Sequence, residues 1–186
     1  MLTQQLKDYV KLYENIIHDD LCDSAVRSLS EDVWQKHYYF NAVTQEHTTN
    51  EDDLEMSWQN IPERQAITDG LYSAIDSYLK DIKSECFQGW QGYSPLRFNK
   101  YHENKKMHYH CDHIQDLFGS GPNGIPILSI VGGLNDDYEG GEFVMWDTVI
   151  EIPKGSVLMF PSVFLYPHKV EPVTKGTRYS YVSWVF

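Results

Sequence analysis

The chain has 186 residues, with 27 acidic and 15 basic side chains, and its net charge of −12 is spread over both halves. One domain is expected at this length, and a hydrophobic content of 41% is enough to bury a core, which excludes a disordered chain. The acid excess argues against a protein that holds duplex nucleic acid by its phosphates, and three cysteines without a CxxC spacing argue against a disulfide framework or a thiolate zinc knuckle.

Two helices are predicted in the first half of the chain. Asp19 or Asp20 can cap a short helix over about 20–30, since an aspartate at this position accepts a backbone N–H of the first turn. A longer amphipathic helix is predicted over about 62–84, where Pro62 suits the first turn. Its apolar side chains recur at steps of three and four residues: Ile67, Leu71, Ala74, Ile75, Tyr78, Leu79 and Ile82.

Two other segments of the first half have no clear period. The stretch 9–17 fits either a helix or a strand, and its pattern does not decide between them. Segment 43–57 is polar and acidic, and we expect it to be a surface loop.

After residue 90 the sequence changes to short runs of β-branched and aromatic residues that are separated by glycine, proline, asparagine and aspartate. Strands are predicted near 95–102, 106–110, 126–134, 141–146, 148–152, 156–160, 166–173 and 177–185. Short strands at this spacing are typical of a sandwich, jelly roll or barrel rather than a parallel α/β sheet. We therefore expect a mainly β (α+β) fold with the helices packed on one outer face of the β core.

A candidate metal site begins at the second of these strands. His110 and Asp112 are two residues apart, so in a strand their side chains point to the same face and can converge on one ion. His168 lies in a late strand and can supply a third ligand. Two histidines and one carboxylate form the facial triad of non-haem Fe(II) oxygenases. Zinc is the competing metal, but the helical HExxH pair of many His₂-carboxylate zinc sites is absent.

Further polar residues surround this pattern. Arg178 follows His168 by ten residues and shares a strand face with Ser180. A guanidinium can hold a carboxylate with two parallel hydrogen bonds, and a neighbouring hydroxyl can add a third. His108 falls on the same strand face as His110 and can line the site, although we expect it to be structural or solvent-facing. Cys111, which points to the opposite face, is expected to be a small buried packing residue.

These residues belong to a series of short motifs that spans about 96–186, nearly half of the chain. In chain order they are Arg97-Phe98-Asn99-Lys100-Tyr101, His110-Cys111-Asp112, Leu134-Asn135-Asp136, Gly140-Gly141-Glu142, Gly155-Ser156-Val157-Leu158-Met159-Phe160-Pro161, His168-Lys169-Val170 and Gly176-Thr177-Arg178-Tyr179-Ser180. In this order and at these distances they resemble the Fe(II)- and 2-oxoglutarate-dependent dioxygenases, most closely the compact prolyl 4-hydroxylase-like branch of bacteria and phages.

The resemblance implies a double-stranded β-helix (jelly roll) with iron at one open end. It implies three Fe(II) ligands (His110, Asp112 and His168), with Arg178 pairing with the distal carboxylate of 2-oxoglutarate and Ser180 or Tyr101 hydrogen-bonding the co-substrate. O₂ would be the second co-substrate, and ascorbate can support such enzymes. Many prolyl 4-hydroxylases have lysine at the Arg178 position, and many relatives have tyrosine where this chain has Met107. These departures widen the range of substrates to be considered.

By the same resemblance, the chain is expected to hydroxylate an unactivated C–H bond, in a prolyl or other side chain of a peptide or protein, with release of succinate and CO₂. One alternative is an AlkB-like nucleic-acid demethylase, which Asn99-x-Tyr101 also resembles, but no basic residue follows Arg178. The others are a small-molecule hydroxylase acting on a free amino acid and a non-catalytic jelly-roll binding module. The intact triad and Arg178 argue against the last of these.

The organisation of the chain follows from these patterns. We expect a single domain over 1–186, with 1–90 as a helical support and 91–186 as the β core that carries the site. Loops 43–57 and 113–125 are long enough to cover the open end. No stretch approaches the roughly 20 apolar residues of a membrane span, and no signal peptide is apparent, so a cytoplasmic protein without a membrane or nucleic-acid partner is predicted. The sequence does not indicate an oligomeric state.

Overall fold

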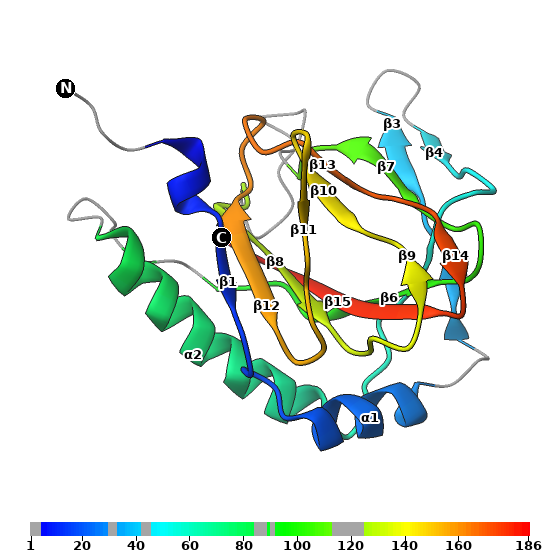
Figure 1. Ribbon diagram of the computed structural model, residues 1–186, viewed down its shortest axis with the longest axis horizontal. Coiled ribbons are helices and arrows are strands. Elements are labelled where there is room, and N and C mark those ends of the chain that lie inside the picture. Colours follow the sequence, from blue (N-terminus) through cyan, green and yellow to red (C-terminus); the bar gives the residue numbers. More distant parts are fainter. Residues whose placement is uncertain (1–4, 30–32, 42–45, 84–88, 90–91, 113–124) are drawn as a thin grey trace.

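Two antiparallel sheets lie face to face at the centre of the molecule (Figure 1). The computed structural model describes residues 5–29, 33–41, 46–83, 89, 92–112 and 125–186. The larger sheet has the strand order β1 (Lys11–Tyr13), β12 (Val157–Pro161), β8 (Leu128–Gly133), β15 (Arg178–Val185), β6 (Arg97–Tyr101), β5 (Glu55–Ser57) and β2 (Gln35–Lys36). The smaller sheet has the order β11 (Thr148–Ile150), β10 (Phe143–Met145), β13 (His168–Val170) and β7 (Met107–His110).

The remaining strands form two short antiparallel pairs. These pairs are β14 (Val173–Lys175) with β9 (Glu139–Gly140), and β3 (Tyr39–Asn41) with β4 (Glu46–Thr48). The helical elements are the 3₁₀ helix η1 (Leu6–Tyr9), α1 (Asp19–Ser28) and α2 (Arg64–Ile82). Helices α1 and α2 cover the outer face of the larger sheet (Figure 1). No helix in these ranges is long and apolar enough to cross a membrane.

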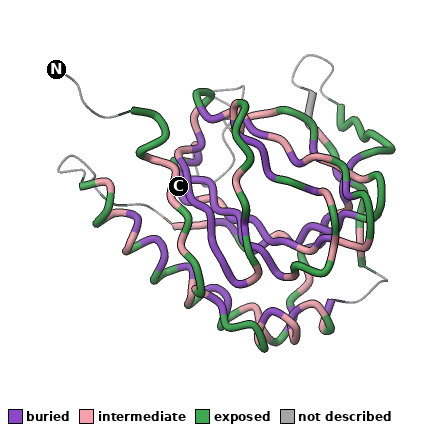
Figure 2. Tube along the Cα trace, viewed as in Figure 1, coloured by how far each residue is buried: buried purple, intermediate pink, exposed green. Residues whose placement is uncertain are grey.

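The strand alternation divides the core into two layers. Tyr181 and Val185 of β15 and Phe98 of β6 point to the outer face of the larger sheet, where they form one apolar cluster with the buried side chains of α2. The intervening residues of both strands point instead between the two sheets. Figure 2 shows the result, with buried residues along the strands and along the sheet-facing side of α2. The side chains between the sheets are therefore the ones that can form an internal site.

The predicted mainly β fold with helices on one face is confirmed. Each of the eight strands predicted after residue 90 coincides with an observed strand, and β9 and β14 are further strands in that region. Strands β2 to β5, which precede residue 90, were not predicted. Both helices are also confirmed, but the predicted cap of α1 is wrong. The Nδ1 atom of His18 accepts the N–H of Asp20 at 3.3 Å, and Asp19 and Asp20 lie inside the first turn, where their charges favour the helix dipole.

The two segments without a clear period, 9–17 and 43–57, both contain strands. The stretch 9–17 contains the end of η1 and strand β1. The surface loop predicted over 43–57 is wrong within its described part, because β4 and β5 lie there and β5 joins the larger sheet beside β6. Leu54 and Met56 are buried, with exposed fractions of 1% and 2%. Leu54 and Met56 are spaced as in a strand, but the residues around them are acidic, and the composition of the segment therefore indicated a loop. The burial of this strand depends on its pairing with β6.

Candidate metal centre and surrounding pocket

His110, Asp112 and His168 come together between the two sheets. The pairing of β7 with β13 places His110 directly opposite His168, with their ring centroids 4.4 Å apart. The Oδ1 atom of Asp112 lies 3.5 Å from Nε2 of His110 and 3.9 Å from Nε2 of His168. One ligand atom from each side chain lies within 4.8 Å of the others, so a single ion can contact all three.

Hydrogen bonds fix the orientation of both imidazole rings. Nδ1 of His110 lies 2.7 Å from the carbonyl oxygen of His108, and Nδ1 of His168 lies 3.0 Å from that of Tyr166. A carbonyl oxygen only accepts, so each Nδ1 donates and each Nε2 keeps its lone pair for a metal. Phe143 stacks on the His168 ring at 5.1 Å, which limits rotation of that ring further.

The protonation states of Asp112 and His168 also suit a metal. Burial raises the pKa of Asp112, but its interactions with His110, His168 and Ser129 outweigh this effect and hold that pKa well below its usual range. Burial lowers the pKa of His168, against the opposing effect of Asp112. Near neutral pH Asp112 is therefore a carboxylate and His168 a neutral imidazole, which are the forms that bind a divalent metal. The donor set fits a non-haem Fe(II) site with positions left open for other ligands.

Arg178 is a buried cation beside this triad. Its side chain is 3% exposed, and Nη1 donates to Ser180 Oγ at 3.1 Å. The guanidinium carbon lies 5.0 Å from the ring centroid of Tyr101, the residue opposite Arg178 in the β15–β6 pairing. Within the described ranges, no carboxylate oxygen lies within 4.0 Å of the guanidinium. A buried charge without a counter-ion is costly, so this site is suited to an anionic ligand.

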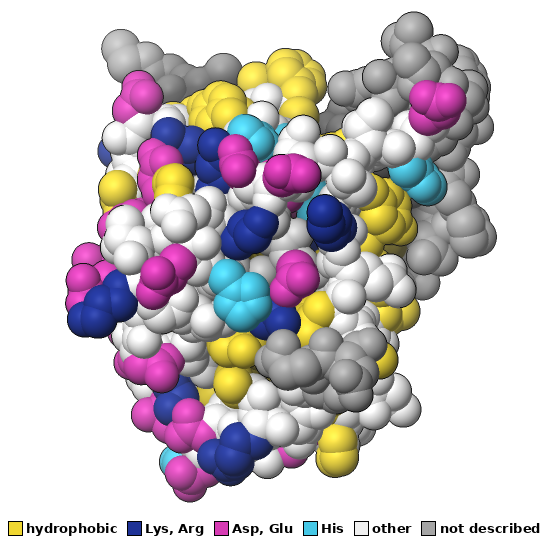
Figure 3. Space-filling view, turned by 90° about the vertical axis from the view of Figure 1, so that its right-hand side faces the viewer, with side chains coloured by type: hydrophobic (Ala, Val, Ile, Leu, Met, Phe, Trp, Pro, Cys, Tyr) yellow, Lys and Arg dark blue, Asp and Glu magenta, His cyan; other side chains and the backbone are white. Residues whose placement is uncertain are grey.

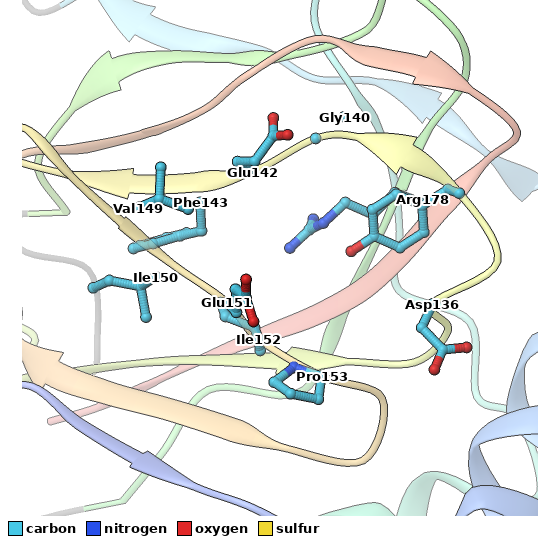
Figure 4. A pocket seen from close by; sticks show the side chains of 12 residues that line it. Asp136, Gly140, Glu142, Phe143, Val149, Ile150, Glu151, Ile152, Pro153 and Arg178 are labelled. Atoms are coloured by element: carbon cyan, nitrogen blue, oxygen red, sulfur yellow. The ribbon is translucent and has the colours of Figure 1, made fainter.

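Two hollows meet at Arg178. One contains the triad and is lined by residues of both sheets, including Tyr101, Ser180 and Trp184. The other is a cavity of about 460 Å³ beside β10 and β11, and Figure 4 shows the Arg178 guanidinium pointing into it. Arg178 and Phe143 are the two residues that line both hollows. The structure thus brings together all six residues predicted for the site, listed here in chain order: Tyr101, His110, Asp112, His168, Arg178 and Ser180.

Other predictions around the site have mixed outcomes. His108 does not line the triad pocket; its Nε2 lies 3.5 Å from Oδ1 of the buried Asp53, which agrees with a structural role. Cys111 is partly rather than fully buried, so the prediction of a buried packing residue is wrong. It directly follows the last residue of β7, at the edge of the smaller sheet. His113 and most of loop 113–125 lie outside the described residues.

Arg97, Asn99 and Trp184 are among the pocket residues that were not predicted to be functional. Arg97 and Asn99 are on β6 at steps of two from Tyr101, and Trp184 is on β15 at a step of two from Val182. The same alternation that placed Arg178 and Ser180 on one face was therefore the signal that could have found them. Without this signal, Trp184 fits an ordinary core position and Arg97, at the start of a strand, fits a surface position.

His37 is a buried histidine beside this pocket, with a consequence for stability. Burial, with smaller effects from Arg97 and His110, lowers the pKa of His37 to about 3, and Asp53 Oδ2 at 3.9 Å is too distant for a hydrogen bond that would oppose this. The unfolded chain, with a pKa near 6.5, binds this proton more readily than the folded chain. Folding stability is therefore lost as the pH falls from about 6.5 toward 3.

We expect His37 to contribute a loss of about 1 kcal/mol in unfolding free energy between pH 7 and pH 5.5. Urea unfolding of the wild type and of His37→Phe at the two pH values measures this contribution, which the variant should lack. The exposed His47, changed to Phe, serves as the matched control and should keep the wild-type dependence. Equal pH dependence in wild type and His37→Phe would contradict the expectation.

Comparison with known families covers the segment that carries the site. Residues 96–186 match the family model described as the 2OG-Fe(II) oxygenase superfamily. A PKHD-type hydroxylase of Xylella fastidiosa (strain M12) is 36% identical over 102 residues, which cover 49% of this chain and 44% of that protein. One from Janthinobacterium sp. (strain Marseille) is 35% identical over 100 residues, covering 50% and 43%. The chain thus spans less than half the length of these curated relatives.

Solved structures show similarity over almost the whole chain. The viral collagen prolyl hydroxylase of Paramecium Bursaria Chlorella virus-1 has a TM-score of 0.68 at 16% identity and covers 95% of this chain and 94% of its own. A Pseudomonas putida prolyl-4-hydroxylase gives 0.65 at 22% identity, with coverages of 95% and 92%. A Trichoplax adhaerens prolyl hydroxylase in complex with a hypoxia inducible factor peptide fragment gives 0.69 at 17%, with coverages of 96% and 84%. The fold is therefore the jelly roll of these oxygenases, and residues 96–186, just under half of the chain, are similar in sequence to the 2OG-Fe(II) oxygenase superfamily.

Proposed function

We propose that the protein is an Fe(II)- and 2-oxoglutarate-dependent oxygenase that hydroxylates an unactivated C–H bond, with release of succinate and CO₂. The observation that carries the proposal is Arg178, a buried guanidinium without a carboxylate partner in the described ranges, next to a His₂-Asp triad. A triad alone fits several metals, but a triad with a buried anion site matches the chelating dicarboxylate of this family. Succinate formation with peptides and with free amino acids distinguishes the two classes of substrate.

The side chains of this pocket have distinct proposed roles. His110, Asp112 and His168 would hold Fe(II), which when bound supplies the activation of O₂ for C–H hydroxylation. Arg178 would bind the distal carboxylate of 2-oxoglutarate with its guanidinium fork, in an orientation held by the bond to Ser180. Tyr101 would fix the position of the co-substrate from the opposite strand. Its pKa is raised by burial, so its hydroxyl stays protonated and can donate.

Apolar side chains support this chemistry by limiting access of water. Phe143 and Phe160 pack against the His168 ring at 5.1 and 5.0 Å, and Val131 and Val182 line the pocket between the sheets. A low-dielectric wall of this kind strengthens the pairing of Arg178 with a carboxylate. It also protects reactive states of the site from solvent.

We also propose that residues 1–186 act as one domain. Strands β1, β2 and β5, which all precede residue 90, complete the larger sheet, and α1 and α2 cover its outer face. The first 90 residues thus contribute strands as well as helices to the support of the site.

The charge of the chain disfavours a nucleic-acid substrate. The net charge is −12, and on the face shown in Figure 3 basic side chains lie intermingled with acidic ones.

The proposal is tested by co-substrate binding and by product formation. Anaerobic addition of Fe(II) and 2-oxoglutarate should produce the weak visible charge-transfer band of their chelate. Succinate should then form in air with members of a library of proline-containing peptides and free amino acids, and not with methylated single-stranded DNA. His168→Ala should lack both signals, whereas His18→Ala, on the exposed start of α1, should keep both. Absence of the band and of succinate in the wild type would reject an oxygenase.

A further inference from the structure

A second guanidinium, that of Arg97, lies in the same pocket as the triad. Arg97 is the first residue of β6 and pairs with Val182 of β15, so it shares the inward face of the larger sheet with Tyr101 and Arg178. Its guanidinium carbon lies 5.1 Å from the ring centroid of Trp184. Its Nε donates to Oδ1 of the buried Asn99 at 3.1 Å. Both contacts hold the planar group in a fixed position inside the pocket.

Arg97 forms no close ion pair in the described part of the chain, although the Asp112 carboxylate interacts with its charge. No carboxylate oxygen of those residues lies within 4.0 Å of its guanidinium, and the pi face of Trp184 and the amide of Asn99 are neutral. Arg97 is partly buried, and this burial lowers its pKa against the opposing effects of Tyr101 and Asp112, but an arginine remains protonated. The two Nη groups have no hydrogen-bond partner among the described residues. They form an end-on fork that can donate two parallel bonds.

The ligands proposed so far leave the Nη groups of Arg97 without a partner. Asp112 and 2-oxoglutarate would meet the charge of Fe(II), and the distal carboxylate of 2-oxoglutarate would meet that of Arg178. Asp112 and the buried Asp53 are the carboxylates near this pocket in the described residues, and neither lies within 4.0 Å of the Arg97 guanidinium. A guanidinium with two unused donor groups in such a pocket favours a substrate that carries a carboxylate.

We propose that Arg97 binds a carboxylate of the substrate, so that the hydroxylated carbon belongs to an anionic residue or to the neighbour of one. This inference rests on the proposed function, and it narrows the substrate class from any peptide or amino acid to a carboxylate-bearing one. The carboxylate has two chemical sources: the α-carboxylate of a free amino acid or C-terminal residue, and the side chain of an aspartate or glutamate. Asn99 and Trp184 are positioning residues that hold the fork of Arg97 toward the pocket.

The test compares carboxylates with their isosteric amides in the Zn(II)-loaded protein saturated with 2-oxoglutarate, where no turnover occurs. Nuclear magnetic resonance follows the arginine Nε–Hε signals, and Arg97→Lys identifies the Arg97 signal by its absence. The probe pairs are propionate with propionamide, N-acetyl-L-proline with N-acetyl-L-prolinamide, and acetyl-Pro-Asp-amide with acetyl-Pro-Asn-amide. The carboxylate members should shift the Arg97 signal, and the amides should not. Whether the second or third pair binds more tightly identifies the source of the carboxylate.

Variants give the expected magnitude. Arg97→Gln should weaken binding of the carboxylate probes about ten- to hundredfold, as expected for loss of a charge-assisted pair, without changing the affinity for the amides. Arg97→Lys should fall between this variant and the wild type, because it keeps the charge but not the fork. The matched control is Arg27→Gln, on the exposed surface of α1, which should behave as the wild type.

The outcomes separate this inference from the function on which it rests. If 2-oxoglutarate fails to bind the Zn(II) protein, both the proposed function and the inference are overturned. If 2-oxoglutarate binds but the Arg97 signal does not respond to any carboxylate probe, or responds equally to the amides, only the inference is overturned. A shift of the Arg97 signal by 2-oxoglutarate itself, with no further change on adding the probes, would assign Arg97 to the co-substrate and would also overturn it.

Discussion

Replacing Asp112 by alanine is expected to weaken Fe(II) binding by more than about 100-fold and to abolish oxygenase activity. Loss of a residue that merely supports a metal ligand costs about 10- to 100-fold, and Asp112 is itself the anionic member of the triad. Without it, the two imidazole rings of His110 and His168 remain, with centroids 4.4 Å apart, and no carboxylate of the triad balances the charge of the ion. Equilibrium binding of Fe(II) under anaerobic conditions, with metal analysis of the purified variant, measures the loss.

Two further variants show whether the charge or the shape of Asp112 matters. Asp112→Asn keeps the size of the side chain but not its charge, and it should resemble Asp112→Ala in metal binding. Asp76→Ala removes a carboxylate from the exposed face of α2, where it pairs with Lys80, and it should bind Fe(II) as the wild type does. Wild-type affinity in Asp112→Asn would mean that the triad does not act as a charged metal site.

The site was largely predictable because strand alternation is a local rule. His110 and Asp112 bracket one residue at the end of a strand, and Arg178 and Ser180 bracket one residue on another, so each pair was predicted to share a face. Adding His168 required the resemblance to a family, because the sequence alone does not show that β13 lies beside β7. Arg97 obeys the same alternation relative to Tyr101, but a charged residue at the start of a strand is ordinarily solvent-exposed.

The first half of the chain was harder to predict for a related reason. The burial of Met56 depends on its place opposite Asn99 in the β5–β6 pairing, which is a contact between distant segments. Its neighbours in the sequence are acidic, so the local composition indicates a loop. The α2 helix carries its own evidence, since its apolar face repeats over nineteen residues. Periodicity thus identifies long elements, whereas short edge strands are specified by what they pair with.

Replacing Arg178 by glutamine should raise the dissociation constant for 2-oxoglutarate about 100-fold while leaving Fe(II) affinity almost unchanged. Two charge-assisted hydrogen bonds to one carboxylate are lost, and a pair of this kind is worth about 3 kcal/mol. Arg178→Lys should cost about tenfold, because an ammonium keeps the charge but cannot form the fork. Titration of 2-oxoglutarate into the anaerobic Fe(II) protein, followed by the charge-transfer band, measures both effects.

The stability of the Arg178 variants distinguishes a ligand site from a structural ion pair. In the described structure the guanidinium has Ser180 as its hydrogen-bond partner and no carboxylate within 4.0 Å. Removing a buried charge that lacks a counter-ion should therefore leave the unfolding free energy of the ligand-free protein unchanged or raised. If Arg178→Gln instead lost about 3 kcal/mol of stability, Arg178 would be serving the fold. The combination of an intact fold, normal Fe(II) binding and lost 2-oxoglutarate binding is expected only when the charge is kept for a dicarboxylate ligand.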